Sequence, residues 1–362
     1  MKIRNIGVSN YRNIEFARLS LDASRVFLLG RNGQGKTNLL EAIGYMTSLR
    51  AFRARENETL IGPKAAESEI VYELNHETFG AVKAHVKIKK KGKEVSLDGK
   101  QVRRASDFVG RFSAVTLSSE DLNIVRGSPS GRRRFVDTFL CGIDRSYYVA
   151  LQRYQKALQE RNALLKRGDD ESMARSFEAQ LVEPALEIIA KRKSILGELR
   201  NLACRYYETL SGSAEEIDIE YKPNVFVESV DAYQQIFDKN RKRDTYLQNT
   251  GKGPHRDDFT LSLNGRAAMD FASDGQQRSI ALSLAFATFA YWKERYEMTP
   301  LLLVDDVLGE LDPERRARFW TALDGKTQLI ATGTELPECG ESVDWLVYET
   351  RGGRFEKRVP FA

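Results

Sequence analysis

A glycine-rich segment, LGRNGQGKTNLLEAI at residues 29–43, has the residue types and spacing needed to hold a phosphate group. It fits the pattern G-x-x-x-x-G-K-[ST], and an apolar run at 25–29 precedes it. In such a loop, backbone N–H groups turn inward around an anion, the lysine reaches the β- and γ-phosphates, and the threonine hydroxyl ligates Mg²⁺. Residues 38–43 are typical of a helix whose N-terminal end faces the phosphate, which favours a P-loop over an ordinary glycine-rich turn. The predicted nucleotide cradle comprises Gly30, Arg31, Asn32, Gly33, Gln34, Gly35, Lys36 and Thr37.

Two carboxylates end a second apolar run, at residues 300–306. This form is typical of a Walker B strand, and we expect it to lie beside the P-loop. Asp305 is the expected Mg²⁺ carboxylate, directly or through water. Asp306 is expected to point to the opposite face and orient the attacking water, with Lys36 as the other catalytic residue. Two acids at a strand end are also a common surface feature, so the interpretation depends on the P-loop.

A third segment, ASDGQQ at residues 272–277, opens a predicted helix that runs to about residue 291. Ser273, Gly275 and Gln276 resemble the signature motif of ABC-type ATPases, although Ala272 stands where leucine is usual. In that superfamily the signature of one subunit reaches the γ-phosphate held by the P-loop of the other, again through a helix N-terminus. Residues 309–312 resemble the D-loop that crosses the same dimer interface. Taken alone, residues 272–277 could equally be a polar helix cap.

The elements that must position these residues follow from hydrophobic periodicity. Apolar residues recur at helical spacing from 146 to 210, interrupted by the polar break at 167–170, which predicts two long antiparallel helices. A strand at 259–263 followed by Asn264-Gly265 predicts a hairpin. We therefore expect an α/β ATPase domain with a mixed sheet and an antiparallel β subdomain, formed by residues 1–141 and 249–362, and interrupted by a helical arm at 142–248.

A basic hairpin is predicted between residues 82 and 97, where apolar residues alternate with Lys83, His85, Lys87 and Lys89. From residue 83 to 104 there are nine lysines and arginines against two acids. Such a face suits contact with nucleic-acid phosphates. It also suits a solvated edge strand protected by lysines, and the sequence does not decide between the two.

Composition indicates the cellular compartment in which the protein works. The longest nearly apolar run, 280–292, is shorter than the ~18 residues of a membrane span, and no secretory signal opens the chain. The three cysteines, Cys141, Cys204 and Cys339, form no metal or redox spacing. We expect a cytoplasmic protein with no membrane partner. The net charge of +5 is only weak evidence for a polyanionic partner.

Several motifs in one order identify the chain as resembling the RecF family of bacterial recombination mediators, which are related to SMC heads. The motifs are 10–14 (NYRNI), 33–43 (GQGKTNLLEAI), 119–122 (SEDL) with 127–137 (GSPSGRRRFVD), 253–258 (GPHRDD) and 305–312 (DDVLGELD). The resemblance covers nearly the whole chain, with the helical insertion in the expected place.

The resemblance implies an ATP- and Mg²⁺-dependent homodimer that binds duplex DNA near single-strand gaps. It also implies work with RecR and RecO to load RecA in recombinational repair, replication and SOS induction, and a weak DNA-dependent ATPase whose hydrolysis is the release step. Ser273 to Gln276 would complete the partner's nucleotide site. Arg12 is expected near the nucleotide, and Arg132, Arg133 and Arg134 are expected to pair with phosphate or Asp137, or to lie solvated at the surface.

Three departures from the ABC pattern qualify this expectation. Asp306 stands where glutamate is common, which predicts slow turnover. The segment 116–121 occupies the expected Q-loop position without a glutamine, and no histidine occurs near 328–334, where Thr332 or Thr334 could offer only a neutral hydrogen bond. The alternatives are a transporter-type ATPase subunit and a monomeric P-loop kinase, for which the segment 272–277 would be only a helix cap.

Overall fold

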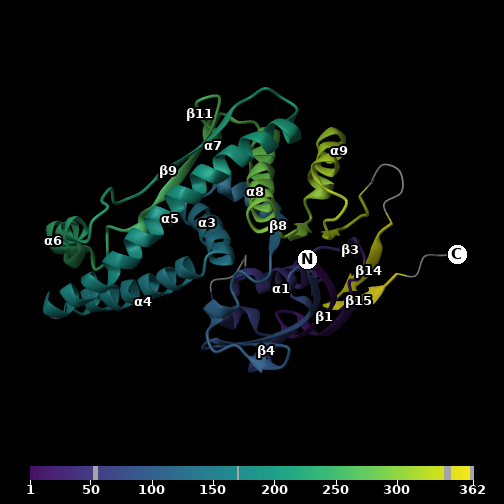
Figure 1. The fold of residues 1–362 in the computed structure, drawn as a ribbon, viewed down its shortest axis with the longest axis horizontal. Coiled ribbons are helices and arrows are strands. Elements are labelled where there is room, and N and C mark those ends of the chain that lie inside the picture. The colour runs from purple at the N-terminus through teal and green to yellow at the C-terminus, as the bar shows by residue number, and fades with distance from the viewer. Residues whose placement is uncertain (52–55, 169–170, 338–343, 359–362) are drawn as a thin grey trace.

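The computed structural model describes residues 1–51, 56–168, 171–337 and 344–358, and within them the chain forms three β-sheets and nine α-helices (Figure 1). Cys339 and part of the predicted polar break at 167–170 lie outside these residues. The mixed α/β architecture is as predicted. Among the described helices, none combines the length and apolarity that a membrane span requires.

A six-stranded central sheet carries the predicted nucleotide site. Its strand order is β15-β14-β3-β13-β12-β8, with β15 antiparallel to β14 and all other neighbours parallel. The strands are β3 (Arg25–Leu29), β8 (Ala114–Ser118), β12 (Leu301–Asp305), β13 (Leu329–Gly333), β14 (Leu346–Arg351) and β15 (Arg354–Lys357).

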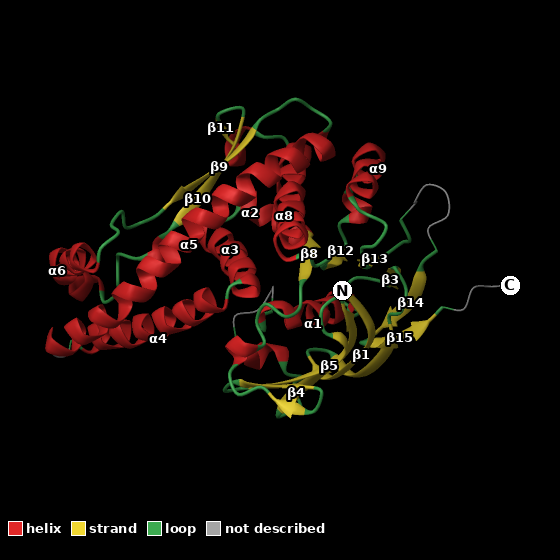
Figure 2. Ribbon diagram, viewed as in Figure 1, coloured by secondary structure: helices red, strands yellow, loops and turns green. Residues whose placement is uncertain are grey.

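Both faces of the central sheet are covered, which explains why its strands read as continuous apolar runs. On β12, Leu301 and Leu303 belong to one hydrophobic core, whereas Leu302 and Val304 belong to the other. The first core also contains α1 (Lys36–Ser48) and the antiparallel sheet; the second contains the buried faces of the longer helices. Figure 2 shows the antiparallel strands below α1 and most helices above the central sheet.

The antiparallel sheet has the order β2-β1-β4-β5-β6-β7. Its strands are β1 (Lys2–Tyr11), β2 (Ile14–Ser20), β4 (Glu67–His76), β5 (Gly80–Lys89), β6 (Lys93–Leu97) and β7 (Lys100–Gln101). The predicted basic hairpin is therefore β5 and β6, and its apolar residues face the core as expected. However, β5 is not an edge strand, because it pairs with β4 on one side and β6 on the other.

Helices form the arm and the cover of the central sheet. The two predicted long helices are confirmed as α4 (Arg145–Arg167) and α5 (Glu171–Ser211), which pack against each other and extend to the left in Figure 1. Near the tip of the arm lies α6 (Val230–Leu247). The remaining helices are α2 (Leu122–Arg126), α3 (Pro129–Ile143), α7 (Ala268–Phe271), α8 (Asp274–Tyr296) and α9 (Pro313–Ala322).

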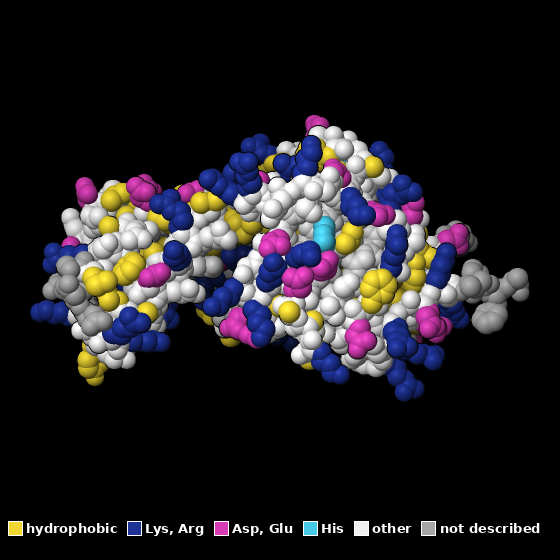
Figure 3. Space-filling model, turned by 90° about the horizontal axis from the view of Figure 1, so that it is seen from below, with side chains coloured by type: hydrophobic (Ala, Val, Ile, Leu, Met, Phe, Trp, Pro, Cys, Tyr) yellow, Lys and Arg dark blue, Asp and Glu magenta, His cyan; other side chains and the backbone are white. Residues whose placement is uncertain are grey.

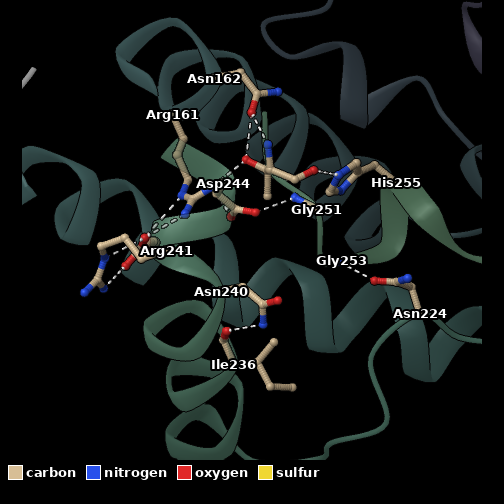
Figure 4. A network of polar contacts seen from close by, with 12 residues as sticks. Arg161, Asn162, Asn224, Ile236, Asn240, Arg241, Asp244, Gly251, Gly253 and His255 are labelled. Atoms are coloured by element: carbon tan, nitrogen blue, oxygen red, sulfur yellow. Dashed lines mark hydrogen bonds and ion pairs between the residues drawn. The ribbon is translucent and has the colours of Figure 1, made fainter. Parts of the chain in front are cut away.

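A buried polar network fastens the arm helices together (Figure 4). Arg161 of α4 is fully buried and donates to Glu178 of α5 at 2.8 Å and to Asp244 of α6 at 2.9 Å. Its guanidinium also donates to the Thr250 hydroxyl at 2.7 Å. Breaking a buried ion pair of this kind by removing one partner costs about 3–5 kcal/mol, so these contacts fix how the three helices sit.

The segment 142–248 is not wholly helical. It contains β9 (Ile217–Lys222), which pairs antiparallel with β10 (Asp258–Leu263) in a three-stranded sheet completed by β11 (Arg266–Ala267). The predicted hairpin turn between β10 and β11 is confirmed, since Asn264 and Gly265 have φ values of 49° and 74°. The division into domains at residues 141 and 249 stays a prediction.

Candidate nucleotide-binding site

The predicted P-loop joins β3 to α1 and needs glycine at two positions for different reasons. Gly35 caps α1 with φ of 108°, in the left-handed region that other residues avoid. At Gly30, a Cβ atom would lie 2.5 Å from the backbone oxygen of Thr350 on β14. A side chain there would push β14 away from β3. Glycine at position 30 is therefore needed for the pairing of these two strands.

Lys36 is buried at the start of α1 and is only 3% exposed. Its Nζ donates to the backbone oxygens of Gly30 at 2.6 Å and Arg31 at 3.3 Å, and lies 3.8 Å from Asp306 Oδ1. The ammonium group is thus held inside the loop by weak neutral acceptors, where phosphate oxygens could replace them. This arrangement fits the predicted role of Lys36.

The predicted Mg²⁺ ligands lie together. The Thr37 hydroxyl donates to Asp305 Oδ1 at 2.8 Å, and the same oxygen accepts the Thr332 hydroxyl at 2.9 Å. The end of the Walker B strand lies beside the P-loop, as predicted, although β13 separates β12 from β3 within the sheet. Thr332, on that intervening strand, fills the space between them. A hydroxyl and a carboxylate in contact are oxygen ligands of the kind that Mg²⁺ prefers, so the residues present fit a Mg–nucleotide site.

Asp306 does not simply follow the alternation of the strand before it. Its φ is 58°, a left-handed conformation, and its N–H donates to the Thr332 hydroxyl at 3.1 Å. The left-handed backbone turns the chain, and the carboxylate lies near Lys36 instead of on the far side of the strand. Both acids therefore meet P-loop residues. Of the two threonines proposed to replace a switch histidine, Thr332 makes these contacts, whereas Thr334 is exposed.

The P-loop is supported by residues on both of its sides. Gln34 accepts from the N–H groups of Gly352 and Gly353, both at 2.8 Å, in the turn between β14 and β15. On its other side, Asn13 accepts from the Asn38 amide at 2.7 Å and donates to the Gln34 backbone oxygen at 3.4 Å. The motif at 10–14 therefore holds the loop. No sequence pattern indicated the contribution of the β14–β15 turn.

Arg12 lies behind the P-loop helix. Its Nε donates to Glu41 of α1 at 2.6 Å, and Glu41 also accepts from the Tyr11 hydroxyl at 3.0 Å. Glu41 is fully buried, so this pair anchors α1 to the end of β1. The expected approach of Arg12 to a nucleotide stays a prediction.

The signature segment forms a helix cap. Ser273 accepts from the Gln276 N–H at 3.3 Å, and Gln276 accepts from the Ser273 N–H at 2.7 Å, which together make a capping box at the start of α8. Gln276 also donates to Glu215. Ser273 is exposed, and so are Met269 and Phe271 just before it. Figure 1 separates α7, which leads into this cap, from α1 and its P-loop.

The D-loop segment contacts the signature helix within the same chain. Asp312 caps α9 by accepting the Arg315 N–H at 2.8 Å, and Arg315 Nε donates to Ser279 of α8 at 3.2 Å. Arg278 of α8 donates to the Glu310 backbone oxygen at 2.6 Å. These arginines, which sequence reasoning missed, join the two predicted interface motifs into one surface.

The predicted Q-loop position borders the Walker B carboxylate. On β8, Ser118 is in register with Asp305 of β12, and its N–H donates to Asp121 at 2.6 Å. Burial of the carboxyl group raises the pKa of Asp121 to about 7, although the Ser118 N–H acts in the opposite direction. Asp121 is therefore an additional polar group beside the site, where sequence comparison with the ABC pattern looks for glutamine.

The three arginines at the start of α3 have different hydrogen-bond partners among the described residues, and Asp137 is within the electrostatic reach of Arg133. Arg132 makes two hydrogen bonds to Asp258, at 2.7 and 2.9 Å, and Arg133 donates to the Asp257 backbone oxygen at 2.7 Å. Arg134 donates to the backbone oxygen at position 51 at 2.8 Å. Asp137 forms an ion pair with Arg192 of α5 at 2.8 Å.

The basic hairpin is less basic than its sequence. Lysines of β5 and of the turn after it pair with glutamates. Three of these glutamates lie on β4 or η1 (Asn57–Leu60), outside residues 83–104, and so were not part of the charge count. The pairs are Lys83–Glu73, Lys87–Glu69, Lys89–Glu94 and Lys90–Glu58. Figure 3, seen from the side of this sheet, shows positive and negative side chains interspersed. Individual surface pairs add little stability, but these four reduce the positive field of β5 and the turn after it.

Comparison with known proteins agrees with this geometry. A protein-family model described as the RecF/RecN/SMC N-terminal domain matches residues 2–338. The chain belongs to the RecF family. The DNA replication and repair protein RecF of Exiguobacterium is 36% identical over 361 residues, with 97% of this chain and 95% of the relative covered. The RecF of Leptospira interrogans is 34% identical over 348 residues, with 93% and 92% covered.

Solved structures place the fold in the same family. The recombination mediator protein RecF in its ATP form, from the RecFOR pathway, matches with a TM-score of 0.87 and 28% identity, over 99% of this chain and 98% of that one. An SMC head bound to the C-terminal winged-helix domain of ScpA matches with a TM-score of 0.54 and 14% identity over 99% and 98%, which shows the fold alone. The predicted RecF-family ATPase head fold is therefore confirmed.

Proposed function

We propose that this chain is an ATP-switched, DNA-binding recombination mediator that acts as a homodimer. The main support for this proposal is that one chain holds two incomplete parts of a nucleotide site, and that these parts lie apart from each other (Figure 1). Lys36, Thr37 and Asp305 form a phosphate and Mg²⁺ half-site, and the exposed Ser273 cap of α8 forms the other. Each half-site lacks what the other supplies, so a second copy completes it. The solved RecF structure in its ATP form supports ATP as the nucleotide.

The N-terminus of α8 suits contact with a γ-phosphate held by the other subunit. The helix has 23 residues, and its first N–H groups carry the positive end of the helix dipole. Exposed Met269 and Phe271, at 55% and 62% exposure, flank the cap. Apolar side chains exposed next to a polar anion site are what a protein interface would cover.

In the dimer, each residue has a limited task. Backbone N–H groups of 30–35 and the Lys36 ammonium hold the phosphates, while Thr37 and Asp305 hold Mg²⁺, which supplies charge neutralisation at the phosphates when bound. Asp306 orients water for attack. Its side chain is one methylene shorter than glutamate, which favours slow hydrolysis. Slow hydrolysis suits a switch, because loss of the γ-phosphate contact releases the dimer.

The DNA substrate and the partners rest on family membership. RecF-family function, extended to this chain, makes duplex DNA next to single-strand gaps the binding target. It makes RecR the direct partner, with RecO and RecA in the same pathway. Assistance to RecA loading then connects the ATP switch to recombinational repair, to replication and to SOS induction.

The test is sedimentation of the purified protein with a labelled gapped duplex, with and without Mg-ATP. Lys36→Met is the control, because it removes the buried ammonium from the P-loop. We expect ATP to shift the wild type, and not the variant, into a DNA-bound dimer. A protein that remains monomeric and off the DNA with Mg-ATP would overturn the proposal.

A further inference from the structure

A cavity of about 560 Å³ opens between α1, α3 and α4, which meet near the centre of Figure 1. It lies on the arm side of α1 and has no lining residue in common with the P-loop. Its volume is in the range of sites that hold small molecules. Five cationic side chains line it, namely Arg50, Lys93, Arg133, Arg134 and Arg192.

Two of these cations are committed to structure. Arg192 pairs with Asp137 and with Asp257 at 3.0 Å, and it joins α3 and α5 to the loop before β10. Arg134 donates to the backbone next to α1. Asp137 also lines the cavity, and its carboxylate accepts hydrogen bonds from Arg192 and from the Tyr147 hydroxyl.

The other three cations have only neutral acceptors among the described residues. Arg50 donates to the Gln155 side-chain oxygen at 3.4 Å, Lys93 donates to the Leu49 backbone oxygen, and Arg133 donates to a backbone oxygen. Burial, and after it the neighbouring charge of Arg50, lowers the pKa of Lys93 to about 8. Five cations thus line the cavity against two acids, Glu56 and Asp137, and Asp137 is held by Arg192, so positive charge is in excess there. Arg50, Lys93 and Arg133 are half-buried, and a cation that is partly removed from water without an anionic hydrogen-bond partner is costly, so a bound anion would stabilise it.

A second observation points to the same ligand. The hydroxyl of Tyr45, a cavity-lining residue that is 1% exposed, has no hydrogen-bond partner within the described part of the chain. Lys93 Nζ lies 5.5 Å from the centre of the Tyr45 ring. Buried hydroxyl groups are nearly always satisfied, and an anionic oxygen bound in the cavity would accept the hydrogen bond that the Tyr45 hydroxyl can donate.

We propose that the cavity between α1, α3 and α4 is a binding site for a small phosphate-bearing anion. Arg50, Lys93 and Arg133 supply charge-assisted hydrogen bonds, and Tyr45 supplies a neutral one. The phosphate has two possible sources, a free phosphorylated molecule or the terminal phosphate of a DNA strand. The site is independent of the proposed ATP switch, because its residues belong to neither predicted half-site.

The experiment is isothermal titration of the full chain with inorganic pyrophosphate, in the absence of ATP. All proteins carry Lys36→Met, which weakens binding at the P-loop. Arg50→Gln and Lys93→Gln are then compared with Lys156→Gln, a matched loss of charge at an exposed position of α4 that does not line the cavity. We expect saturable binding that is about tenfold weaker with each cavity variant and unchanged with Lys156→Gln, because a hydrogen bond to a charged group has roughly that value.

Residual pyrophosphate at the P-loop cannot imitate this result, because Arg50 and Lys93 do not contact that loop. Should Lys93→Gln fail to fold, as judged by thermal unfolding, Arg50→Gln decides alone, since its only described hydrogen bond is long. No saturable binding, or equal weakening by Lys156→Gln, would overturn the proposal. Competition with a 5′-phosphorylated and an unphosphorylated oligonucleotide distinguishes the sources. Displacement by the phosphorylated strand alone supports a DNA terminus, and displacement by neither supports a free phosphorylated molecule.

Discussion

The Thr37 hydroxyl donates to Asp305 at 2.8 Å, although 268 positions separate the two residues in the sequence. The same carboxylate oxygen accepts from Thr332, whose hydroxyl in turn accepts the Asp306 N–H. One threonine on the intervening strand β13 therefore sets the positions of both acids that follow β12. The carboxylate of Asp305 and the Thr37 hydroxyl are already in contact, so these oxygen atoms are preorganised for a hard cation such as Mg²⁺.

Replacing Thr332 with valine tests this role. The change keeps the side-chain shape, removes the donor to Asp305, and leaves the Asp306 N–H without its acceptor. We expect the free energy of unfolding without ATP to fall by about 1–3 kcal/mol, and ATP hydrolysis to slow as well. Urea unfolding and steady-state ATPase assays measure the two effects. Thr334→Val is the matched control, because Thr334 is exposed, and equal effects of the two variants would contradict the role of Thr332.

Replacing Ser273 with arginine separates a helix cap from a dimer contact. Ser229 caps α6 through a similar bond, from the Ala232 N–H at 3.3 Å, and is also exposed. We expect Ser273→Arg and Ser229→Arg each to cost about 1 kcal/mol of stability through the lost cap. Only Ser273→Arg is expected to abolish the ATP-dependent dimer, as seen by sedimentation velocity with Mg-ATP. A dimer that survives this change would favour a P-loop kinase or another monomeric ATPase.

The ion pairs of β5 lead to a prediction about DNA binding. Because Lys87, Lys89 and Lys90 are paired with glutamates, we expect their joint replacement by glutamine to change the salt dependence of duplex binding very little. Loss of three phosphate contacts would instead flatten the slope of log K against log salt by about 2.7. Fluorescence anisotropy across a salt series measures the slope. A change near that size would show that DNA displaces the glutamates.

The sequence was sufficient where function depends on a short contiguous pattern. The strand–loop–helix order around residues 25–48 and the Asn264-Gly265 turn are local features, and the structure confirms each of them. What it could not supply were partners distant in the chain. Glu69 lies on a different strand from Lys87, and Gln34 rests on a turn more than 300 residues away, so neither contact leaves a local signal. Strand β9 is an exception, because apolar and acidic residues alternate at 217–220 and this local pattern is typical of a strand.

His255 is neutral in the folded protein, and its contacts show which tautomer is present. Its Nε2 lies 2.9 Å from the Thr250 backbone oxygen, which can only accept, so Nε2 carries the proton. Its Nδ1 therefore accepts from the Tyr154 hydroxyl, at 2.6 Å. Burial, and then the charges of Arg256, Arg133 and Arg161, lowers the pKa of His255 to about 4, although the Thr250 oxygen favours the protonated form.

This lowered pKa predicts a loss of stability in acid. An unfolded histidine binds a proton below pH 6.5 or so, whereas folded His255 stays neutral to about pH 4. The stability that depends on neutral His255 is therefore fully present above about pH 6.5. It is lost as the pH falls toward 4, which lowers the free energy of unfolding by at most about 3 kcal/mol. His255→Gln keeps a donor for Thr250 but does not titrate. We expect the free energy of unfolding of the wild type, measured in urea, to fall by about 2–3 kcal/mol more than that of the variant between pH 7.5 and pH 4.5. A difference that stays constant between the two pH values would show that the pKa of His255 is not lowered in the folded protein.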